Sequence, residues 1–459
     1  MKVRLVVLVV FLVIATLSAG LIAAPGTATP AVQAAAGPLA PRQVTGALTY
    51  TTHLPIVLSC YPRQGPDPDF HLQYDMSIIN ADAAWGLCSI NASGVTIAII
   101  DTGVDLTHSD LQANLVAGYD FVDNDAVPDD GAGHGTNVAG IAAAALNGTG
   151  VAGVAPTAKI MPVRVLDNTG SGYVSDIADG ITYAADRAAV LNLSLGGAAS
   201  STTLQNAINY AANAKGRLVV AAAGNCGSNY NNPGCNYTQY QPIYPAAYPN
   251  VMAVAATTSS DTRASFSNVG TYVDIAAPGV GIYNAYYGDS YAYESGTSQA
   301  APHVSGLAAL VWAKNPSYTA AQVWSRITST AVDLGAAGVD TSFGAGRIDV
   351  QQALGLTLMQ AEAPAVNPAE ATPAPAVDER TAPFAPGRII VKFKDEAGKA
   401  AVAQMLAALP DATVEKSIAA IDVLVLHVPA GGEWKMIDQL RGQPEVEYAE
   451  PDYLIHMLH

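Results

Sequence analysis

The chain has 459 residues, half of them hydrophobic, which is enough to bury a full core and to form more than one domain. Its 38 acidic side chains outnumber the 21 basic ones, and the net charge of -17 repels phosphate backbones and anionic lipid surfaces. Composition therefore argues against a disordered chain and against nucleic acid as a partner.

The N-terminus has the features of an export signal, predicted to span residues 1–24. A basic start precedes an apolar run over 5–17, and small residues follow it. An uncleaved membrane anchor is the alternative, because the apolar stretch approaches the ~20 residues that span a bilayer. Cleavage is favoured because the next stretch contains small residues and proline. Residues 25–66 then form a flexible lead-in with little periodicity.

The four cysteines of an exported chain predict two disulfides, although four thiols allow three pairings. Cys226 and Cys235 bracket a short loop rich in glycine and asparagine, so they are expected to pair locally. That leaves Cys60 to pair with Cys88. Free buried thiols are the alternative, and they are less common outside the cytosol.

Residues 67–356 alternate apolar runs with helical stretches and are predicted to form one large domain. Continuous apolar runs suit buried parallel strands, here at 95–100, 160–166, 190–193, 218–223 and 251–256. Helical periodicity lies between them, at 177–185 and 203–214. This βαβ series predicts an α/β fold with a doubly wound, mainly parallel sheet and helices on both faces.

Residues 357–386 are dense in proline, alanine and glutamate without hydrophobic periodicity, which is typical of an extended linker. A second domain is predicted over 387–459. It contains expected strands at 388–393, 423–428 and 446–449, and expected helices at 399–409 and 434–441. The order of these elements fits a small α+β domain of the ferredoxin-like kind.

Three short motifs of the large domain combine into a candidate catalytic set. Asp101 ends the first strand, His134 lies between glycines, and Ser298 begins a helix predicted to run to about Ala313. Each has an ordinary structural alternative: a turn-former, an exposed loop residue and an N-cap. Together they supply a hydroxyl, an imidazole to take its proton and a carboxylate to orient the imidazole, as acyl transfer requires. The chain order Asp, His, Ser is one of the known convergent orders.

Asn225 is a candidate donor to the oxyanion of the same reaction. It lies just past the predicted strand 218–223, and the carboxyl ends of parallel strands converge on one edge of a sheet. Paired with the backbone N–H of Ser298, it would stabilise a tetrahedral intermediate by roughly 3 kcal/mol per donor. An asparagine chosen only for turn geometry is the alternative.

At these motifs the sequence resembles the subtilisin-like serine peptidases, and over about 67–356 it looks closest to their thermitase-like branch. The matching segments are Asp-Thr-Gly-Val from Asp101, His-Gly-Thr from His134 and Gly-Thr-Ser-Gln-Ala-Ala-Pro-His-Val from Gly296. The sequence departs from the family pattern at Asn137, where a second histidine is usual, and at Gln299, where methionine is usual. Neither position carries the proton transfer.

The resemblance implies a secreted, monomeric endopeptidase of broad specificity that acts on proteins and peptides, with attachment to the cell surface left open. Its substrate would add as a strand between two backbone edges. Ile243 is expected at the base of the primary pocket, unless it is simply a core residue. The implied edges are Gly170, Ser171 and Gly172 on one side and Ser194, Leu195 and Gly196 on the other.

Calcium is the expected cofactor. Residues 120–130 hold five carboxylates and no basic residue, which is costly unless the loop is solvated or neutralised. Oxygen ligands of this kind suit Ca²⁺, although a merely solvated acidic loop is the alternative. The resemblance implicates Asp120, Asp123, Asp125 and Asp129 in one site. It implies a second site at Asp67, Asp110 and the loop that begins with Asn147.

The last domain resembles the folding and inhibitory prodomain that usually precedes this kind of catalytic domain. Residues 25–66 are too short for a prodomain, whereas the first and last strands of 387–459 look like those of the family. We expect the tail 453–459 to lie in the cleft as a product-like strand, held by the high effective concentration that the linker provides. Cutting the linker would release it. An unrelated adhesion module of the same fold is the alternative.

Two other functions fit parts of the sequence. One is a pseudoenzyme that binds peptides on the same scaffold, and the other is an inhibitor or adhesion protein whose last domain is the functional part. The complete set of Asp101, His134, Asn225 and Ser298 favours an active serine endopeptidase that forms an acyl-enzyme and is inhibited by its own C-terminal domain.

Overall fold

The computed structural model describes residues 67–85, 90–227, 241–356, 379–409 and 411–458, all of which belong to one compact unit. The predicted export signal, the lead-in 25–66 and most of the predicted linker lie outside these residues. Cys60, Cys88 and Cys235 also lie outside them.

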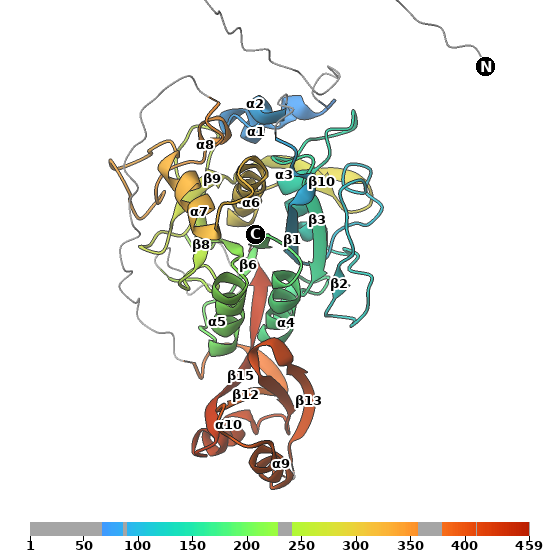
Figure 1. Cartoon of the computed structure of the whole chain (residues 1–459), viewed down its shortest axis with the longest axis vertical. Helices are drawn as coiled ribbons and strands as arrows, with labels where there is room; N and C mark the ends of the chain where they lie inside the picture. The colour runs from blue at the N-terminus through green and yellow to red at the C-terminus, as the bar shows by residue number, and fades with distance from the viewer. Residues whose placement is uncertain (1–66, 86–89, 228–240, 357–378, 410, 459) are drawn as a thin grey trace, which may run out of the picture. The chain divides into compact units, whose positions relative to one another are not determined.

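The centre of the described part is a seven-stranded parallel sheet in the order β2-β3-β1-β5-β7-β8-β9 (Figure 1). Its strands are rich in β-branched and small apolar residues and are buried on both faces, as the continuous apolar runs predict. The strands are β1 (Thr96–Asp101), β2 (Tyr119–Asp120), β3 (Lys159–Arg164), β5 (Val190–Leu193), β7 (Leu218–Ala222), β8 (Val251–Thr257) and β9 (Ile275–Pro278).

Helices cover both faces of this sheet. Alternate residues of β1 point to opposite faces, so Ile97 and Ile99 belong to one buried cluster and Ala98 and Ile100 to the other. The first face packs against α3 (His134–Ala143) and α6 (Thr297–Lys314), and the second against α4 (Val174–Ala185) and α5 (Thr202–Asn209), which a π-turn (Tyr210–Ala214) extends. The predicted doubly wound arrangement is confirmed.

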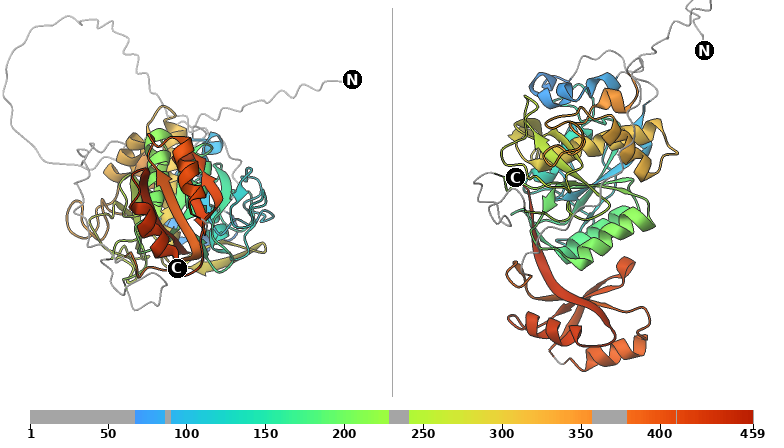
Figure 2. Two further views of the ribbon diagram at one scale, coloured as in Figure 1. Left: turned by 90° about the horizontal axis from the view of Figure 1, so that it is seen from below. Right: turned by 90° about the vertical axis from the view of Figure 1, so that its left-hand side faces the viewer.

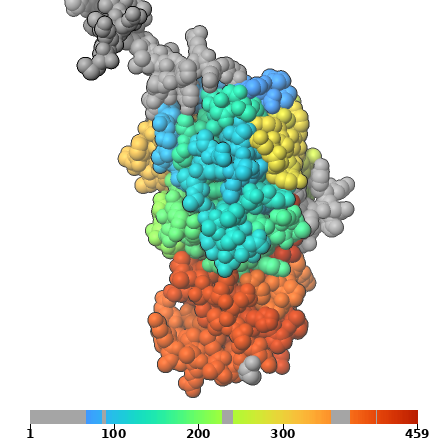
Figure 3. Space-filling view, turned by 90° about the vertical axis from the view of Figure 1, so that its right-hand side faces the viewer, coloured from blue at the N-terminus to red at the C-terminus, as the bar shows by residue number. Residues whose placement is uncertain are grey.

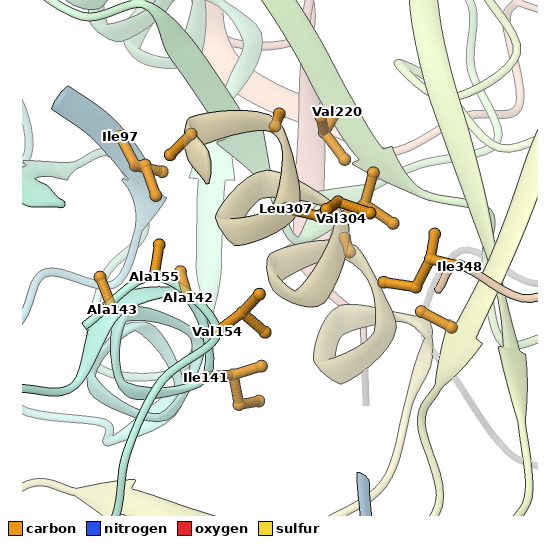
Figure 4. Packing of buried hydrophobic residues seen from close by; sticks show 14 of the residues in the cluster. Ile97, Ile141, Ala142, Ala143, Val154, Ala155, Val220, Val304, Leu307 and Ile348 are labelled. Atoms are coloured by element: carbon orange, nitrogen blue, oxygen red, sulfur yellow. The ribbon is translucent and has the colours of Figure 1, made fainter. Parts of the chain in front are cut away.

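Helix α6 is buried along most of its length at the centre of the large domain. Figure 4 shows Val304 and Leu307 of this helix among Val220 of the sheet, Ile348 and residues of α3 and the segment that follows it. A helix surrounded by apolar neighbours on all sides has little freedom to shift. The N-terminus of α6, where Ser298 lies, is therefore held firmly.

The remaining elements of the large domain lie around this core. They include a hairpin of β10 (Ile282–Tyr286) and β11 (Ser290–Glu294), and two short strands, β4 (Ser171–Tyr173) and β6 (Leu195–Gly196). The helices are α1 (Tyr74–Ile78), α2 (Asp82–Trp85), α7 (Ala320–Ser329) and α8 (Val350–Ala353), with 3-10 turns at Phe70–Leu72 and Ala92–Gly94. No helix among the described residues is both long and apolar enough to cross a membrane.

The C-terminal region folds around its own apolar core, formed by residues such as Ile389, Leu426 and Ile437. Its antiparallel strands follow the order β13-β14-β12-β15, with α9 and α10 in the connections. The ferredoxin-like classification of this region stays a prediction. The elements are β12 (Phe384–Phe393), α9 (Lys399–Ala407), β13 (Thr413–Ile418), a 3-10 turn (Ala419–Ile421), β14 (Val423–His427), α10 (Glu433–Arg441) and β15 (Val446–Met457).

Strand β15 differs most from the sequence prediction, which places a short strand at 446–449. The strand instead continues to Met457, because its second half pairs with β4 and β6 of the large domain. Figure 2 shows this long red strand passing from the C-terminal region into the large domain. A single strand therefore belongs to both regions, and partners distant in the sequence determine its length.

Candidate active site

Asp101 and His134 form a buried pair at the carboxyl end of β1. His134 Nδ1 lies 2.7 Å from Asp101 Oδ1, and both side chains are almost fully buried. Because a carboxylate can only accept, Nδ1 must carry the proton of the bond. That tautomer leaves Nε2 with the lone pair that a general base needs.

The turn before His134 depends on two neighbouring residues. Gly133 adopts a φ of +97°, and a Cβ placed on it would lie 2.4 Å from the ring of Tyr286, so only glycine fits. Asp130 accepts hydrogen bonds from the backbone N–H groups of Gly133 and Thr136. Asp130 therefore fixes the first turn of α3, and with it the position of His134.

The pKa of His134 reflects two opposing causes. Burial lowers the pKa, but the charge of Asp101 and its hydrogen bond outweigh that effect. Asp130 and Glu294 add smaller contributions of the same sign as Asp101. The net result is a pKa above the ordinary value for histidine, so the protonated imidazole is stabilised.

Ser298 lies in the first turn of α6 and is fully buried. Its Oγ donates to the carbonyl of Ser194 at 3.1 Å and also to the carbonyl of Leu458, near the C-terminus. Helix α3, which begins with His134, packs against α6. Ser194 follows β5 and Asp101 ends β1, and these two strands are parallel neighbours, so Ser298 and His134 both lie at the carboxyl edge of the sheet.

Asn225 follows β7 and reaches the same helix start. Its Oδ1 accepts from the backbone N–H of Thr297 at 2.9 Å and from the Thr297 hydroxyl at 2.8 Å. Since the oxygen of the amide is occupied in this way, Nδ2 faces the other direction. That buried nitrogen has no hydrogen-bond partner among the described residues, so it is available as a donor.

The chain's own tail lies as a strand between the two predicted substrate edges. On one side, β15 pairs antiparallel with β4, with His456 opposite Ser171 and Ile455 opposite Gly172. On the other, it pairs with β6, with Met457 opposite Leu195 and His456 opposite Gly196.

The two outer edge residues contact the tail as well. Met457 N–H donates to the Gly170 carbonyl at 2.8 Å, and Leu458 N–H donates to the Ser194 carbonyl at 3.4 Å. All six residues of the predicted edges therefore contact one extended segment.

Leu458 occupies an apolar pocket beside Ser298. A Cβ placed on Gly196 would lie 2.4 Å from Ile243 Cγ2 and 3.2 Å from Leu458 Cδ1, so glycine leaves the space that these side chains fill. Leu458 is only 2 % exposed and belongs to the same buried cluster as Ile243. The arrangement can hold an apolar side chain immediately before a carbonyl that faces a nucleophile.

Family membership follows from comparison with known proteins. A model described as the subtilase family matches residues 92–346, which is more than half of the chain and contains Asp101, His134, Asn225 and Ser298. This chain belongs to the subtilase family. It is accordingly a serine peptidase of the subtilisin-like kind.

Individual relatives support the same assignment. The subtilase is 47% identical to thermitase of Thermoactinomyces vulgaris over 291 residues, 63% of this chain and 98% of the relative. It is 50% identical to a thermophilic serine proteinase of Bacillus sp. strain AK1, over 61% of this chain and 67% of the relative. A solved structure of proteases from Pseudoalteromonas arctica matches with a TM-score of 0.56 at 36% identity, over 63% of this chain and 99% of that one.

A second model, the fervidolysin N-terminal prodomain, matches residues 370–452. The predicted resemblance of the C-terminal region to a subtilase prodomain is confirmed. In this subtilase the prodomain-like region follows the peptidase region, whereas the model is named for an N-terminal position.

The prodomain-like region docks on the N-termini of α4 and α5 through two carboxylates of β15. Glu450 accepts hydrogen bonds from the Ser201 hydroxyl and from the backbone N–H groups of Thr202 and Thr203, at 2.8 to 2.9 Å. Asp452 accepts from the backbone N–H and the hydroxyl of Ser175, both at 2.9 Å. Carboxylates at these positions satisfy free N–H groups and complement the positive ends of the helix dipoles.

A cluster of charges surrounds the contact at α4. Arg388 lies 3.4 Å from Asp452, and Lys416 lies 2.6 Å from both Asp176 and Asp179. Burial raises the pKa of Asp452 to about 6, and the charge of Arg388 only partly offsets this effect. Complementary charges thus line the contact between the two regions of the chain, which lie directly against each other in Figure 3.

Asp67 and Asp110 form a second buried cluster, away from the catalytic set. Asp67 Oδ1 accepts from the Gly148 N–H at 2.6 Å, and Asp110 Oδ2 accepts from the Val151 N–H at 3.0 Å. The remaining oxygen of each carboxylate is buried and has no hydrogen-bond partner among the described residues. Burial raises the pKa of Asp67 to about 6, and the nearby charge of Asp110 adds to this rise.

The residues of this cluster fit a calcium ion. Two buried carboxylates that each present an unpaired oxygen require a cation or a proton. Asn147, on the same loop as Gly148, carries an amide oxygen of the kind that Ca²⁺ prefers, and this oxygen also accepts from the Thr149 N–H at 2.8 Å. The structure therefore places the three predicted ligands of this site around one loop.

Four of the five carboxylates of the acidic loop 120–130 line one cavity, and Arg164 lines it with them; the four are Asp120, Asp123, Asp129 and Asp130. Arg164, outside the loop, lies 2.6 Å from both Asp120 and Asp123, and the side chains of Asp123, Asp125 and Asp129 are exposed. No group of three or more His, Cys, Asp or Glu side chains suited to a metal occurs among the described residues. The guanidinium from β3 offsets part of the negative charge of the loop, and the calcium site predicted there stays a prediction.

The predicted disulfides can be followed only in part. Cys226 is disulfide-bonded, and no described cysteine is a free thiol. Its predicted partner Cys235 and the predicted pair Cys60 and Cys88 lie outside the described residues, so the pairing stays a prediction.

Several residues of the site were not predicted from the sequence. The sequence predicts Asp130 only as a member of the acidic loop, although a carboxylate shortly before a helix start is a usual capping signal. Thr297 belongs to a matching motif, but the motif predicts no role for its side chain. Glu450 and Asp452 carry no local signal, because the helix starts that they cap are distant in the sequence.

Proposed function

We propose that this subtilase is an exported serine endopeptidase that acts through Asp101, His134 and Ser298 and is held inactive by its C-terminal region. The main support is the Leu458 carbonyl, which contacts the Ser298 hydroxyl while the preceding residues pair with both substrate edges. A protein substrate would bind in the same way once the tail has left the cleft.

In this mechanism Ser298 Oγ attacks the carbonyl carbon of the scissile bond, and its proton passes to His134 Nε2. Asp101 accepts from Nδ1 and stabilises the imidazolium that forms. Asn225 Nδ2 and the Ser298 N–H donate to the oxyanion. His134 then protonates the leaving amine, and water hydrolyses the acyl-enzyme by the reverse sequence of proton transfers.

The tail inhibits because it competes with substrate for the cleft of its own chain. The tail and the cleft are joined through the linker, so the tail competes at a high effective concentration with any substrate. The bonds of Glu450 and Asp452 to the starts of α5 and α4 add affinity outside the cleft. Proteolysis of the linker would convert the inhibitor into a separate molecule that can dissociate.

Calcium would bind at Asp67, Asp110 and Asn147, where it supplies the positive charge that two buried carboxylates lack. Its role would be structural, because the cluster lies on loops that join the start of the domain to its core. A second calcium ion would bind at the acidic loop, where the single charge of Arg164 leaves most of the carboxylate charge uncompensated; its ligands would be Asp120, Asp123, Asp125 and Asp129.

Export would proceed through the basic and apolar segment at 1–24, which a signal peptidase would remove. An oxidising destination is consistent with disulfides between Cys226 and Cys235 and between Cys60 and Cys88. The proposed enzyme is a monomer that acts on proteins and peptides and does not bind nucleic acid.

Labelling by a fluorophosphonate probe tests this function. We would compare the full-length protein, a Leu458→Glu variant in which a charge cannot enter the apolar pocket, and Ser298→Ala. We expect weak labelling of the first, strong labelling of the second and none of the third. A folded Leu458→Glu protein that stays unlabelled would instead indicate a peptide-binding protein without catalysis, and equal labelling of the first two would disprove inhibition by the tail.

A further inference from the structure

Asn225 can donate to an oxyanion only if the backbone that carries it is fixed. Thr297 holds the oxygen end of its side chain. Its Nδ2 lies near the carbonyl of the bound tail, because a Cβ placed on Gly296 would lie 3.1 Å from Asn225 Nδ2 and 3.0 Å from the Leu458 carbonyl oxygen. A displacement of about 1 Å at such a donor is enough to lose a large part of its effect. The groups that hold the backbone of Asn225 therefore matter for catalysis.

The loop around Asn225 receives no support from regular secondary structure. Residues 223–227, all of them described, lie outside helices and strands. Gly224 has a φ of +111°, and a Cβ placed there would lie 2.6 Å from both Asn268 Nδ2 and Ile243 Cγ1, so the turn requires glycine. Backbone groups that lie outside a helix or a sheet must find their partners in other segments.

Asn268 supplies such partners on both sides of Asn225. Its backbone N–H donates to the Gly224 carbonyl at 2.9 Å, and its Oδ1 accepts from the Cys226 N–H at 2.7 Å. Asn268 is fully buried, so both bonds are shielded from water. Fixing the peptide groups before and after Asn225 fixes the direction in which its side chain leaves the backbone.

The orientation of the Asn268 amide follows from its partners. Nδ2 donates to the carbonyl of Gln241 at 2.9 Å and to the Tyr272 hydroxyl at 3.3 Å. Because a carbonyl can only accept and a backbone N–H can only donate, Oδ1 must face Cys226 and Nδ2 must face Gln241. The Tyr272 hydroxyl in turn donates to the Ala223 carbonyl at 2.8 Å, so the same network also holds the start of the loop.

Asn268 acts on the loop and not on the reacting groups. Among the described residues, its N–H and its amide bond to Gly224, Cys226, Gln241 and Tyr272. None of these partners belongs to the proposed proton relay or to the tail. An effect of Asn268 on the reaction must therefore pass through the loop that carries Asn225.

We propose that Asn268 is a positioning residue for the oxyanion donor of this peptidase. It keeps Asn225 Nδ2 directed at the carbonyl oxygen by fixing Gly224 and Cys226. The proposal rests on the proposed role of Asn225 as an oxyanion donor. Loss of the Asn268 amide slows the chemical step, whereas β4 and β6, which bind the substrate backbone, keep their places.

The test measures kcat and KM for a peptide amide whose acyl segment ends in leucine. Measurements use the full-length chain with Leu458→Glu, so that the tail does not occupy the cleft. In this background Asn268→Ala should lower kcat by at least about tenfold, because Asn225 Nδ2 loses its fixed position. The same change should alter KM by less than about twofold.

A double-mutant cycle distinguishes positioning from general stability. If Asn268 acts through Asn225, then adding Asn268→Ala to Asn225→Ala should lower kcat by less than about a further twofold. A purely structural role would give the same loss of kcat in both backgrounds.

Asn114→Ala is the matched control. Asn114 is buried, and its Nδ2 donates to the carbonyls of Ala143 and Pro156 at 3.0 and 2.8 Å, at the end of α3 opposite to His134. Removing this amide should lower the Tm, as Asn268→Ala does, but should leave kcat of the folded protein unchanged. A loss of kcat in both variants would assign the effect to stability and overturn the proposal.

Asn268→Ser is a second variant in case the alanine variant does not fold. Its hydroxyl side chain is shorter, and a water in the space that the amide leaves can bond to the polar groups of the loop. This variant should show the same loss of kcat and the same lack of additivity with Asn225→Ala.

The outcomes separate this proposal from the one on which it rests. A loss of kcat that disappears in the Asn225→Ala background supports both. If Asn225→Ala alone lowers kcat, then an unchanged kcat in Asn268→Ala, or equal losses in both backgrounds, overturns the role of Asn268 only. If Asn225→Ala leaves kcat unchanged, or the fluorophosphonate does not label the parent protein, the proposed function fails and this proposal fails with it.

Discussion

The carbonyl of Leu458 accepts a hydrogen bond from the hydroxyl of Ser298, although the two residues are 160 positions apart. The contact places a backbone carbonyl of the chain where a substrate carbonyl would be attacked. It arises because β15 continues out of the C-terminal region into the gap between β4 and β6. The relationship between the two regions is therefore that of a ligand in a peptide-binding cleft.

Removing the side chain of Asn225 should slow catalysis without weakening substrate binding. In the Leu458→Glu background, Asn225→Ala should lower kcat about 10²- to 10³-fold with little change in KM, because Nδ2 acts only on the developing oxyanion. Steady-state kinetics on a peptide amide would measure this. Asn225→Asp keeps the acceptor for Thr297 and loses the donor, so a similar loss in that variant would assign the effect to Nδ2.

The decrease of kcat/KM at low pH should depend on the charges around His134. Asp101 and, to a smaller extent, Glu294 raise its pKa by stabilising the protonated ring, and only the neutral ring can act as a base. Glu294→Gln should therefore lower this pKa and extend activity to lower pH. A profile of kcat/KM against pH would show the shift, and Asp125→Asn at an exposed carboxylate should leave the profile unchanged. A shift to higher pH would contradict this account.

Glu450 should contribute strongly to inhibition by the tail. Glu450→Ala removes three hydrogen bonds at the start of α5. Bonds to charged groups are worth about 1.5–3 kcal/mol each, so residual activity of the full-length protein should rise at least about tenfold. Glu447→Ala is the matched control, because Glu447 pairs within the C-terminal region with Lys392 at 3.4 Å and is 45% exposed. Equal activation by both changes would contradict a specific role for the helix cap.

Acidification should weaken docking of the tail through His456. Burial lowers the pKa of this imidazole, which lies 3.0 Å from the Ser171 hydroxyl, and the charge of Asp167 only partly offsets the effect. The docked ring therefore resists protonation, whereas the ring of a released tail titrates near 6.5. As the pH falls below about 6.5, protonation favours the released tail, and the contribution of His456 to docking is lost.

Asp452 acts in the opposite direction, because its raised pKa in the docked state favours docking as the pH falls through about 6. The informative measurement is therefore a comparison of inhibition in the wild type and in His456→Gln between about pH 7 and pH 5. The variant should keep its tail docked better than the wild type at the acid end. Parallel pH profiles for the two proteins would rule out a contribution from His456.

Chelation of calcium should lower thermal stability through the cluster at Asp67 and Asp110. An ion present at 100 to 1,000 times its dissociation constant stabilises the folded state by roughly 3–4 kcal/mol, so chelation should lower the Tm by several degrees. Asp110→Asn should lower the Tm and reduce its response to calcium. Asp125→Asn on the acidic loop should remove only the part of the response that belongs to the second site, and a full response in that variant would argue against calcium there.

The candidate site itself was accessible from the sequence because its chemistry is encoded in short segments. Asp101, His134, Asn225 and Ser298 each follow or begin a predicted element, and the parallel order of the strands brings those ends to one edge. The residues that orient them were not accessible. Thr297 acts through a contact with Asn225, a distant segment, and such contacts leave no periodic or local signal. Asp130 differs, because its capping position before α3 is a local signal.

By itself, the sequence determined the doubly wound fold, the candidate catalytic residues and the resemblance of the last region to a prodomain, because apolar periodicity and motif spacing are local properties. The tertiary structure decided the length of β15, the pairing of Arg164 with two carboxylates of the acidic loop and the contact of Leu458 with Ser298. Each of these depends on which distant segments meet. Pairing across a sheet edge and burial of opposite charges are set only when the whole chain has folded.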